Sequence, residues 1–429
     1  MKDFFYNSLK IALTIICRPK HLGSLPTDSA KTIIYVLPHR SFFDLVSLDI
    51  FADRNGLPRP VFTGQEQRQG LTPTILYLFS GSSLTSIRPN FSNEVMDLIN
   101  LSDDERENIE FVPCLVFWGR SLNKKSIRHK RLFFSHWSNP GIKKRLINLI
   151  LNWSDIWIHT AEPISLNSLL TGEKDPHIIY RKITRILRKQ IRNQQTATLG
   201  PSFTERKRLI ADVLNSKQVS SHTTDEADTT GDSKKIGDAQ KIASSIASDM
   251  SYSTIRLLIT VLNWFWNRIY EGIELKGTGK LNAFVDSHTL VYVPCHRSHL
   301  DYLLLSFLLF QKGLMIPHIA SGDNLNIPIL GKILRQGGAF FMRRRFNNDR
   351  LYSDVFNEYL YQIYNQGHSV EFFPEGGRSR SGRLLKPKLG LIKTSVNLHS
   401  KGLRKPIAFV PVYIGYEKII EGSTYVSEL

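Results

Sequence analysis

Apolar segments of strand length alternate with helical patterns along the last third of the chain, and this alternation most limits the possible fold. Residues 290–294 (LVYVP), 369–373 (SVEFF) and 407–412 (IAFVPV) are rich in β-branched and aromatic residues, as buried strands are. Apolar residues at helical spacing fill 302–311 and 351–365 between them. Strands that alternate with helices are typical of an α/β fold, so the sequence predicts a mixed sheet flanked by helices.

A polar stretch divides the 429-residue chain into two parts. Residues 216–250 are rich in Ser, Thr, Asp and Lys and lack aromatic side chains, so we expect an exposed linker there. Residues 1–215 would form an N-terminal α/β and helical region with buried strands at Ile33–Leu37 and Phe111–Trp118. Residues 251–429 would form a second domain.

The chain is strongly basic, with a formal net charge of +18. Such a charge attracts polyanions, which include nucleic acid, anionic membrane surfaces and phosphorylated substrates. No zinc spacing, basic zipper or single-strand-binding motif accompanies it, so we expect no nucleic-acid partner. The basic stretch at 120–131 is either a solvated loop or a patch for an anionic surface.

Cysteine usage and hydropathy both bear on location. Cys17, Cys114 and Cys295 are too widely and irregularly spaced for a disulfide framework or a metal site, which favours a reduced, cytosol-facing location. No segment reaches the ~18 continuous apolar residues of a membrane-spanning helix. If the protein acts on lipid, we therefore expect it to lie on the membrane surface.

Residues 251–275 are strongly apolar and aromatic, and several of their apolar residues share one helical face. Arg256 and Arg268 lie near the two ends of this run, and Trp264 and Trp266 lie within it. The pattern predicts a helix that either belongs to the core or lies in a membrane interface, where Trp and Tyr are enriched.

The motif His296-Arg-Ser-His-Leu-Asp301 directly follows the strand expected at 290–294. His296 and Asp301 are not on the same face of a helix, so they can meet only through a turn between the strand and the next helix. A carboxylate on one imidazole nitrogen leaves the other free to deprotonate an alcohol. The alternative is a solvated histidine with a helix-capping aspartate. We interpret His299 as structural, and Cys295 as pointing away from His296.

Two further motifs are suited to a phosphorylated ligand. Gly337–Arg345 (GGAFFMRRR) joins small residues to consecutive arginines, among them Arg343 and Arg344, whose planar guanidinium groups suit phosphate oxygens. Its alternative is a basic loop after a hydrophobic strand. Phe373–Gly382 (FPEGGRSRSG) follows a strand, where ligand sites gather in α/β sheets. Its glycines, carboxylate and guanidinium could bind a phosphate and orient a polyol, and it is not a P-loop because GK[ST] is missing.

With a fourth motif, Val410–Gly415 (VPVYIG), these motifs resemble in type and order those of the glycerolipid acyltransferase family, most closely its large membrane-bound bacterial members that acylate glycerol 3-phosphate. HRSHLDYLLL, NLNIPILGKILRQGGAFFMRR and FFPEGGRSRSGRLL carry the resemblance. It implies that His296 is the general base and Asp301 its partner, and that 251–429 is the catalytic domain. The substrate-binding residues that it implies are Arg343, Arg344, Glu375, Gly376, Arg378 and Pro411.

The resemblance also implies a reaction. An acyl carrier protein or coenzyme A thioester would acylate the sn-1 hydroxyl of glycerol 3-phosphate, without cofactor or metal, at the cytoplasmic side of a bacterial inner membrane. Lysophosphatidate acyltransferases usually read NHxxxxD and FPEGTR, whereas this chain has CHRSHLD and FPEGGR. Dihydroxyacetone phosphate or lysophosphatidate remains an alternative acceptor. Family members of this type are much longer, so we expect a missing C-terminal region and keep a non-catalytic membrane-surface protein as a further alternative.

The two halves of the chain share a local pattern. Ile33–Leu45 (IIYVLPHRSFFDL) parallels Leu290–Leu303 (LVYVPCHRSHLDYL), and His39 and Asp44 keep the same five-residue separation. The FVP segment that begins at Phe111 likewise parallels the one in the second half, but nothing between them matches FPEGGRSR. The N-terminal unit is therefore either a degenerate, catalytically silent repeat or a chance similarity.

Overall fold

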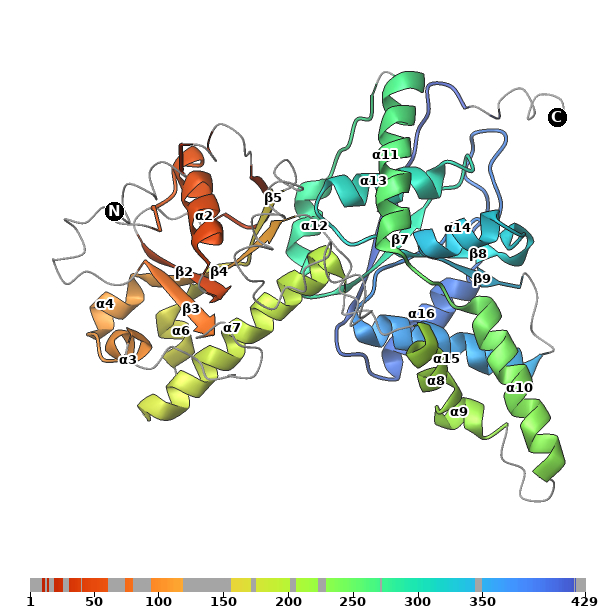
Figure 1. The fold of residues 1–429 in the computed structure, drawn as a ribbon, viewed down its shortest axis with the longest axis horizontal. Helices are drawn as coiled ribbons and strands as arrows, with labels where there is room; N and C mark the ends of the chain where they lie inside the picture. The colour runs from red at the N-terminus through yellow and green to blue at the C-terminus, as the bar shows by residue number, and fades with distance from the viewer. Residues whose placement is uncertain are drawn as a thin grey trace. The chain divides into compact units, whose positions relative to one another are not determined.

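The computed structural model describes residues 10–11, 14, 19–25, 31–39, 41–60, 74–79, 94–118, 156–170, 175–200, 206–222, 229–270, 272–343, 349–419 and 421. The chain forms two compact units. Unit 1 takes most of the residues up to Thr198 together with Gly279–Asp286, and unit 2 takes Leu199–Thr278 and Ser287–Leu429. Figure 1 shows a sheet with accompanying helices in each unit.

Unit 1 is built on a mixed sheet. Its strands are β1 (Lys20–Gly23), β2 (Thr32–His39), β3 (Ile75–Phe79), β4 (Ile109–Trp118), β5 (Ile156–Thr160) and β6 (Ile164–Ser165). Their order is β1-β5-β4-β2-β3, with β6 paired to β4. Strand β2 is parallel to β3 and β4, whereas β4 is antiparallel to β5 and β6. The helices are α2 (Phe42–Arg54), α3 (Glu94–Ile99), α4 (Asp103–Glu107), α6 (Leu166–Leu170), α7 (Pro176–Leu199) and α12 (Thr278–Val285).

Unit 2 is built on a parallel sheet. Its described strands are β7 (Thr289–Pro294), β8 (His318–Gly322), β9 (Ala339–Met342), β10 (Val370–Glu371) and β11 (Ile407–Val412), in the order β11-β7-β10-β8-β9. Each neighbouring pair is parallel. The helices are α8 (Arg206–Leu214), α9 (Lys217–Ser220), α10 (Thr229–Ile246), α11 (Tyr252–Ile269), α13 (Asp301–Gln311), α14 (Leu330–Gly337), α15 (Arg350–Gln366) and α16 (Gly390–Ser400), with a 3₁₀ turn at Asp323–Leu325.

The two faces of this parallel sheet differ. Val291 and Val370 point into the main core, which also contains buried residues of α8, α10, α15 and α16. Because side chains alternate along a strand, their neighbours Tyr292 and Glu371 point to the opposite face. That face lies toward α11 and α13, which pack on each other through residues such as Leu262 and Phe307.

The structure confirms the α/β fold and most of the expected elements. The strands predicted at 290–294 and 407–412 are β7 and β11, and the helices predicted at 302–311 and 351–365 are α13 and α15. The strand predicted at 369–373 is shorter, because only Val370 and Glu371 pair with neighbouring strands. The basic stretch at 120–131 and Cys17 lie outside the described residues.

The expectation of an exposed linker at 216–250 is wrong. This segment contains α9 and α10, and the main core of unit 2 buries Ala239, Ala243 and Ile246 completely. These three residues recur at helical spacing, and the small side chains of the two alanines let α10 approach α15 closely. The preceding helix α8 joins the same core, so the boundary between the units lies at Thr198 and Leu199 rather than at residue 215.

The similarity between the two halves extends to strand register. In unit 1 the strand before His39 pairs with the FVP strand so that Val36 lies opposite Pro113. In unit 2 the strand before His296 pairs with the second FVP strand so that Val293 lies opposite Pro411. Both valines lie three residues before the histidine, so the two parallel pairs have identical register. This agreement favours a degenerate repeat over a chance similarity.

The two units differ in what lies on the other side of the histidine strand. In unit 1 β2 pairs directly with β3, whereas in unit 2 β10 separates β7 from β8. Strand β10 leads into the Phe373–Gly382 motif, and among the described strands of unit 1 none lies in the corresponding position between β2 and β3. Strand β2 also continues through His39, whereas β7 ends at Pro294, before His296.

None of the helices in the described part of the chain combines the length and the apolarity needed to cross a bilayer.

Candidate functional site

The turn between β7 and α13 brings His296 and Asp301 together as predicted. Asp301 is the first residue of α13, and its Oδ2 lies 2.9 Å from Nδ1 of His296. The same oxygen accepts backbone N–H groups of Arg297 (2.6 Å) and Ser298 (2.9 Å). One carboxylate oxygen of Asp301 therefore both holds the turn that precedes α13 and orients the imidazole.

The second carboxylate oxygen of Asp301 accepts a hydrogen bond from a tyrosine hydroxyl that the sequence did not predict. Tyr416 donates its hydroxyl proton to Oδ1 at 2.8 Å. Burial and the charge of Asp301 raise the pKa of Tyr416, so its hydroxyl stays protonated and remains a donor. Asp301 is fully buried, and both of its carboxylate oxygens are hydrogen-bonded, which offsets the cost of removing a polar group from water.

The arrangement leaves Nε2 of His296 as the basic atom. Asp301 accepts at Nδ1 and so places the ring proton there, and 15% of the His296 side chain remains exposed. The Phe373 ring lies against the imidazole, with ring centroids 4.2 Å apart. An oriented, partly exposed imidazole backed by a buried carboxylate can take a proton from a hydroxyl group.

A second buried carboxyl group lies close to the pair. Glu371 of β10 is completely buried, and burial together with the Asp301 charge raises its pKa well above the usual range. Two carboxylates near each other in a poorly solvated site do not both ionise. Both causes favour the protonated form of Glu371.

The Phe373–Gly382 motif lies against the same turn. Glu375 accepts the backbone N–H of His296 through Oε1 and that of Leu385 through Oε2, both at 2.8 Å. The backbone N–H of Ser379 donates to the carbonyl oxygen of His296 at 2.8 Å. The resemblance implies that Glu375 binds the substrate; in the structure its side chain is 6% exposed and acts as a clamp, because it holds the turn at His296 through both carboxylate oxygens.

Two glycines of the motifs are required by the backbone. Gly376 has φ +62°, and a Cβ there would lie 2.9 Å from the Lys388 side chain. Gly338 has φ +120°, and a Cβ there would lie 2.9 Å from the carbonyl oxygen of Pro317. Residues that carry a side chain rarely adopt such φ values, so both positions favour glycine.

The arginines of the site differ in their surroundings. Arg343 donates to Asp349 at 2.8 Å, and its guanidinium lies 4.4 Å from the centre of the Tyr352 ring. Arg344 lies outside the described residues. Arg378 projects from the loop that clamps His296, and its Nη1 lies 3.8 Å from Glu421. Of the predicted arginines that the structure describes, Arg378 is the one shown beside the histidine turn.

The remaining predicted residues line the edge of the site. Pro411 lies in β11, which runs parallel to β7 and ends beside the histidine turn. Cys295 is buried, and its Sγ accepts the backbone N–H of Ile414 at 3.2 Å, which fits a structural thiol. Within the described residues, no group of three or more His, Cys, Asp and Glu side chains is placed to hold a metal ion.

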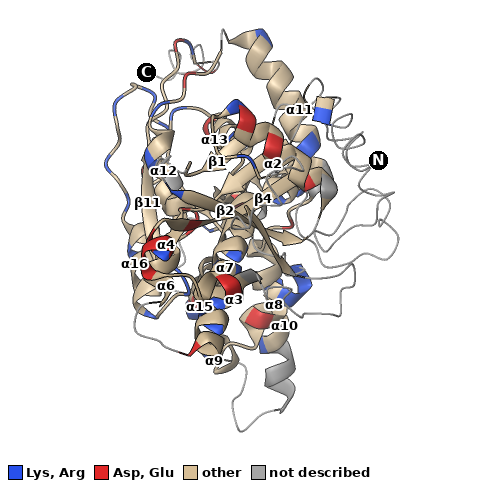
Figure 2. Ribbon diagram, turned by 90° about the vertical axis from the view of Figure 1, so that its left-hand side faces the viewer, with Lys and Arg blue, Asp and Glu red and all other residues tan. Residues whose placement is uncertain are grey.

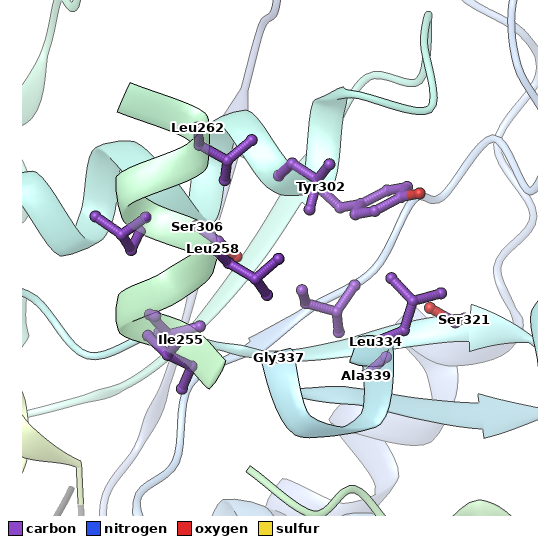
Figure 3. A pocket seen from close by; sticks show the side chains of 13 residues that line it. Ile255, Leu258, Leu262, Tyr302, Ser306, Ser321, Leu334, Gly337 and Ala339 are labelled. Carbon is purple, nitrogen blue, oxygen red and sulfur yellow. The ribbon is translucent and has the colours of Figure 1, made fainter. Parts of the chain in front are cut away.

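An apolar pocket lies along the helix that starts at Asp301. It contains about 500 Å³ of empty space, including its open mouth, and most of its lining side chains are apolar. Figure 3 shows Leu258 and Leu262 of α11 facing Tyr302 of α13 and Leu334 of α14 across this space. Tyr302 directly follows Asp301, so the pocket begins next to the histidine–aspartate pair.

Two family models match the chain. Residues 4–200 match the family model of the glycerol-3-phosphate acyltransferase PlsB N-terminal domain, and residues 272–415 match the acyltransferase model. A glycerol-3-phosphate acyltransferase of Pseudomonas fluorescens is 38% identical over 430 residues, which cover 95% of this chain and 49% of the relative.

Two further glycerol-3-phosphate acyltransferases are similar to the chain to the same degree. One from Ectopseudomonas mendocina is 39% identical over 414 residues, covering 95% of this chain and 50% of the relative. One from Pseudomonas aeruginosa is 37% identical over 456 residues, covering 100% of this chain and 52% of the relative. The chain thus spans about half the length of the curated relatives it matches.

Proposed function

Because the chain belongs to the glycerolipid acyltransferase family, we propose that it transfers a fatty acyl group from a thioester to the sn-1 hydroxyl of glycerol 3-phosphate. The acyl donor is acyl carrier protein or coenzyme A thioester, and the product is 1-acyl-glycerol 3-phosphate. The observation that carries the proposal is the His296–Asp301 pair, with its 2.9 Å contact and its buried, fully hydrogen-bonded carboxylate.

The geometry supports direct transfer, without a covalent acyl-enzyme. Nε2 of His296 takes the proton of the acceptor hydroxyl as its oxygen attacks the thioester carbonyl carbon. The carbon–oxygen bond forms, the carbon–sulfur bond breaks, and the leaving thiolate takes the proton back from the imidazolium. The Asp301 carboxylate stabilises that imidazolium, and Arg378 holds the acceptor's phosphate through its guanidinium.

The apolar pocket is suited to the acyl chain of the thioester. Its apolar lining is that of a site that removes a hydrocarbon chain from water. Since the pocket begins beside Tyr302, a chain lying in it would leave its carbonyl group near the start of α13, where the base is (Figure 3).

The direct test is acyl transfer from a radiolabelled acyl carrier protein or coenzyme A thioester. Glycerol 3-phosphate, dihydroxyacetone phosphate and lysophosphatidate would compete as acceptors, and the product would be identified by chromatography. The assay would run on this chain and on the chain joined to the C-terminal half of a Pseudomonas relative. We expect glycerol 3-phosphate to be acylated faster than the two other acceptors. No transfer in either form would favour the non-catalytic membrane-surface protein.

The contact of Tyr416 with Asp301 gives a prediction about turnover. We expect Tyr416→Phe to lower kcat about tenfold, because a hydrogen bond to a charged group is worth about 1.5–3 kcal/mol and part of it acts on the imidazolium. The KM for both substrates should change little. Tyr413→Phe serves as a control, since Tyr413 contacts Arg297 rather than Asp301. Equal losses in both variants would remove Tyr416 from the orientation of Asp301.

We also propose that the protein lies on the cytoplasmic surface of a bacterial inner membrane. Helix α11 carries Arg256 and Arg268 but no acidic residue (Figure 2). Its side chains Leu257, Val261 and Trp264 are 51–65% exposed, although they are apolar. An exposed apolar face with basic residues and a tryptophan is typical of an interfacial helix. The same helix lines the apolar pocket, so an acyl chain would have a short path from lipid.

The two tryptophans of α11 should respond differently to substitution. Trp264 is 65% exposed, whereas Trp266 is 3% exposed and belongs to the core that joins α11 to α13. We expect Trp264→Ser to weaken binding to anionic vesicles at least about tenfold at high salt, because salt screens the basic residues and leaves the apolar contribution. Trp266→Ser should instead lower the melting temperature.

Sedimentation with vesicles and thermal unfolding separate the two effects. Unchanged vesicle binding by Trp264→Ser would contradict the interfacial placement of this helix.

A further inference from the structure

A carboxylate from the end of the described chain reaches into the site. After β11 the chain passes the histidine turn, and Glu421 comes to lie against it. Its two carboxylate oxygens accept the Ser298 hydroxyl at 3.0 and 2.8 Å, and one of them also accepts the backbone N–H of His299 at 3.0 Å. Nη1 of Arg378 lies 3.8 Å from the same oxygen. One side chain therefore contacts both the histidine motif and the glycine-rich motif.

The histidine motif and the glycine-rich motif are held together at His296 by hydrogen bonds to backbone groups, through Glu375 and through Ser379. These bonds fix where the loop begins, but a guanidinium at the end of a long side chain has several further rotatable bonds. Glu421 supplies a fixed, oppositely charged partner for that guanidinium, anchored on the two residues that follow Arg297.

The position of the guanidinium matters because the acceptor has two hydroxyl groups. In the proposed reaction the phosphate is held by Arg378 and the reacting hydroxyl must reach Nε2 of His296. The sn-1 and sn-2 hydroxyls differ by one carbon in their separation from the phosphate. A displacement of about 1 Å in the phosphate anchor is therefore enough to change which hydroxyl meets the base, and such displacements cost about 100-fold in rate.

We propose that Glu421 is a positioning residue that fixes Arg378 relative to His296 and so selects the terminal hydroxyl of the acceptor. This inference rests on the proposed function and deepens it. Glu421 is not in contact with the reacting atoms, and its role is carried by the arginine and by the turn on which it is anchored. Its side chain is 21% exposed and that of Arg378 is 27% exposed, so water screens their attraction only in part.

Glu421 could instead compete with the substrate, and this alternative role predicts the opposite change in substrate binding. A carboxylate that takes hydrogen bonds from a hydroxyl and an amide beside a guanidinium could also stand in for the substrate's phosphate and compete with it. Removing its charge would then tighten substrate binding. If Glu421 instead positions Arg378, removing its charge weakens substrate binding, so the direction of the change decides between the two roles.

The test is Glu421→Gln, which keeps the size of the side chain and an acceptor oxygen but removes the charge. We expect the KM for glycerol 3-phosphate to rise about fivefold, as for a lost partly exposed ion pair, while the KM for the thioester stays within about twofold. We also expect 2-acyl product to accompany the 1-acyl product. Glu417→Gln is the matched control, because Glu417 is exposed in the same segment and its change in charge is identical.

Each outcome bears on one conclusion. A lower KM for glycerol 3-phosphate in Glu421→Gln, or kinetics and products that match the control, would overturn the positioning role. Wild-type chain that neither transfers an acyl group nor binds glycerol 3-phosphate in a calorimetric titration would overturn the proposed function itself. A melting temperature close to wild type shows that the variant is folded, and Glu421→Asp, with a shortened carboxylate, should restore the charge but only part of the regioselectivity.

Discussion

His296→Ala is expected to lower the rate of acyl transfer by about 10²–10⁴-fold, the usual contribution of general acid–base catalysis. The imidazole is the group whose orientation Asp301, Tyr416 and the Glu375 clamp all serve. Its loss leaves the phosphate anchor and the apolar pocket unchanged. The KM for both substrates should therefore stay near its wild-type value, and steady-state kinetics with glycerol 3-phosphate and a thioester would measure the change.

The matched control is His39→Ala in unit 1, the histidine of the corresponding strand. We expect kcat to stay within about a factor of two, because no described strand of unit 1 corresponds to β10, which leads to Glu375 and Arg378, and the variant removes no contact to the transition state of the proposed reaction. Activity that is lost in His39→Ala but retained in His296→Ala would assign catalysis to the other unit.

Ala243→Asp is expected to lower the free energy of unfolding by about 3–5 kcal/mol, the cost of an uncompensated buried charge. Ala243 is completely buried in the main core of unit 2, among buried residues that include some from α15. A typical protein is stable by only about 5–15 kcal/mol, so this variant should be close to unfolding at physiological temperature. Urea unfolding followed by circular dichroism would measure the loss.

Gln240→Asp adds the same charge to an exposed position of the same helix and should change the stability by less than about 0.5 kcal/mol. If Ala243→Asp is as mild as this control, α10 is not part of the core, and the segment behaves as the exposed linker that its composition suggested.

The composition of α10 shows why that expectation failed. Average polarity describes the whole segment, whereas burial depends on a single face, and the buried face here consists largely of alanines. Alanine contributes little hydrophobicity to a composition but permits close helix packing. The strands β7 and β11 were predictable because their apolar residues are consecutive and large.

The site was predictable only where its residues lie close together in the sequence. His296 and Asp301 are five residues apart, and the turn that joins them follows from the end of one strand and the start of one helix. Tyr416 and Glu421 reach the same turn from 115 and 123 residues away, and no local pattern marks either side chain. The role of Glu375 as a clamp also needed coordinates, because a motif does not reveal which groups a carboxylate faces.

Strand β7 lies between β10 and β11, and this placement has a consequence for synthesis of the protein. A growing chain that contains β7 has neither neighbour available until the residues of β10 have been made, and it remains open on one side until β11 follows. The Tyr416 contact to Asp301 comes still later. A partly synthesised chain therefore carries the histidine motif on an unpaired, apolar strand, which is a state prone to aggregation. The contact between Tyr416 and Asp301 also forms only after β11 has been made, so a chain that stops before β11 would expose apolar surface without the complete site that the proposed reaction needs.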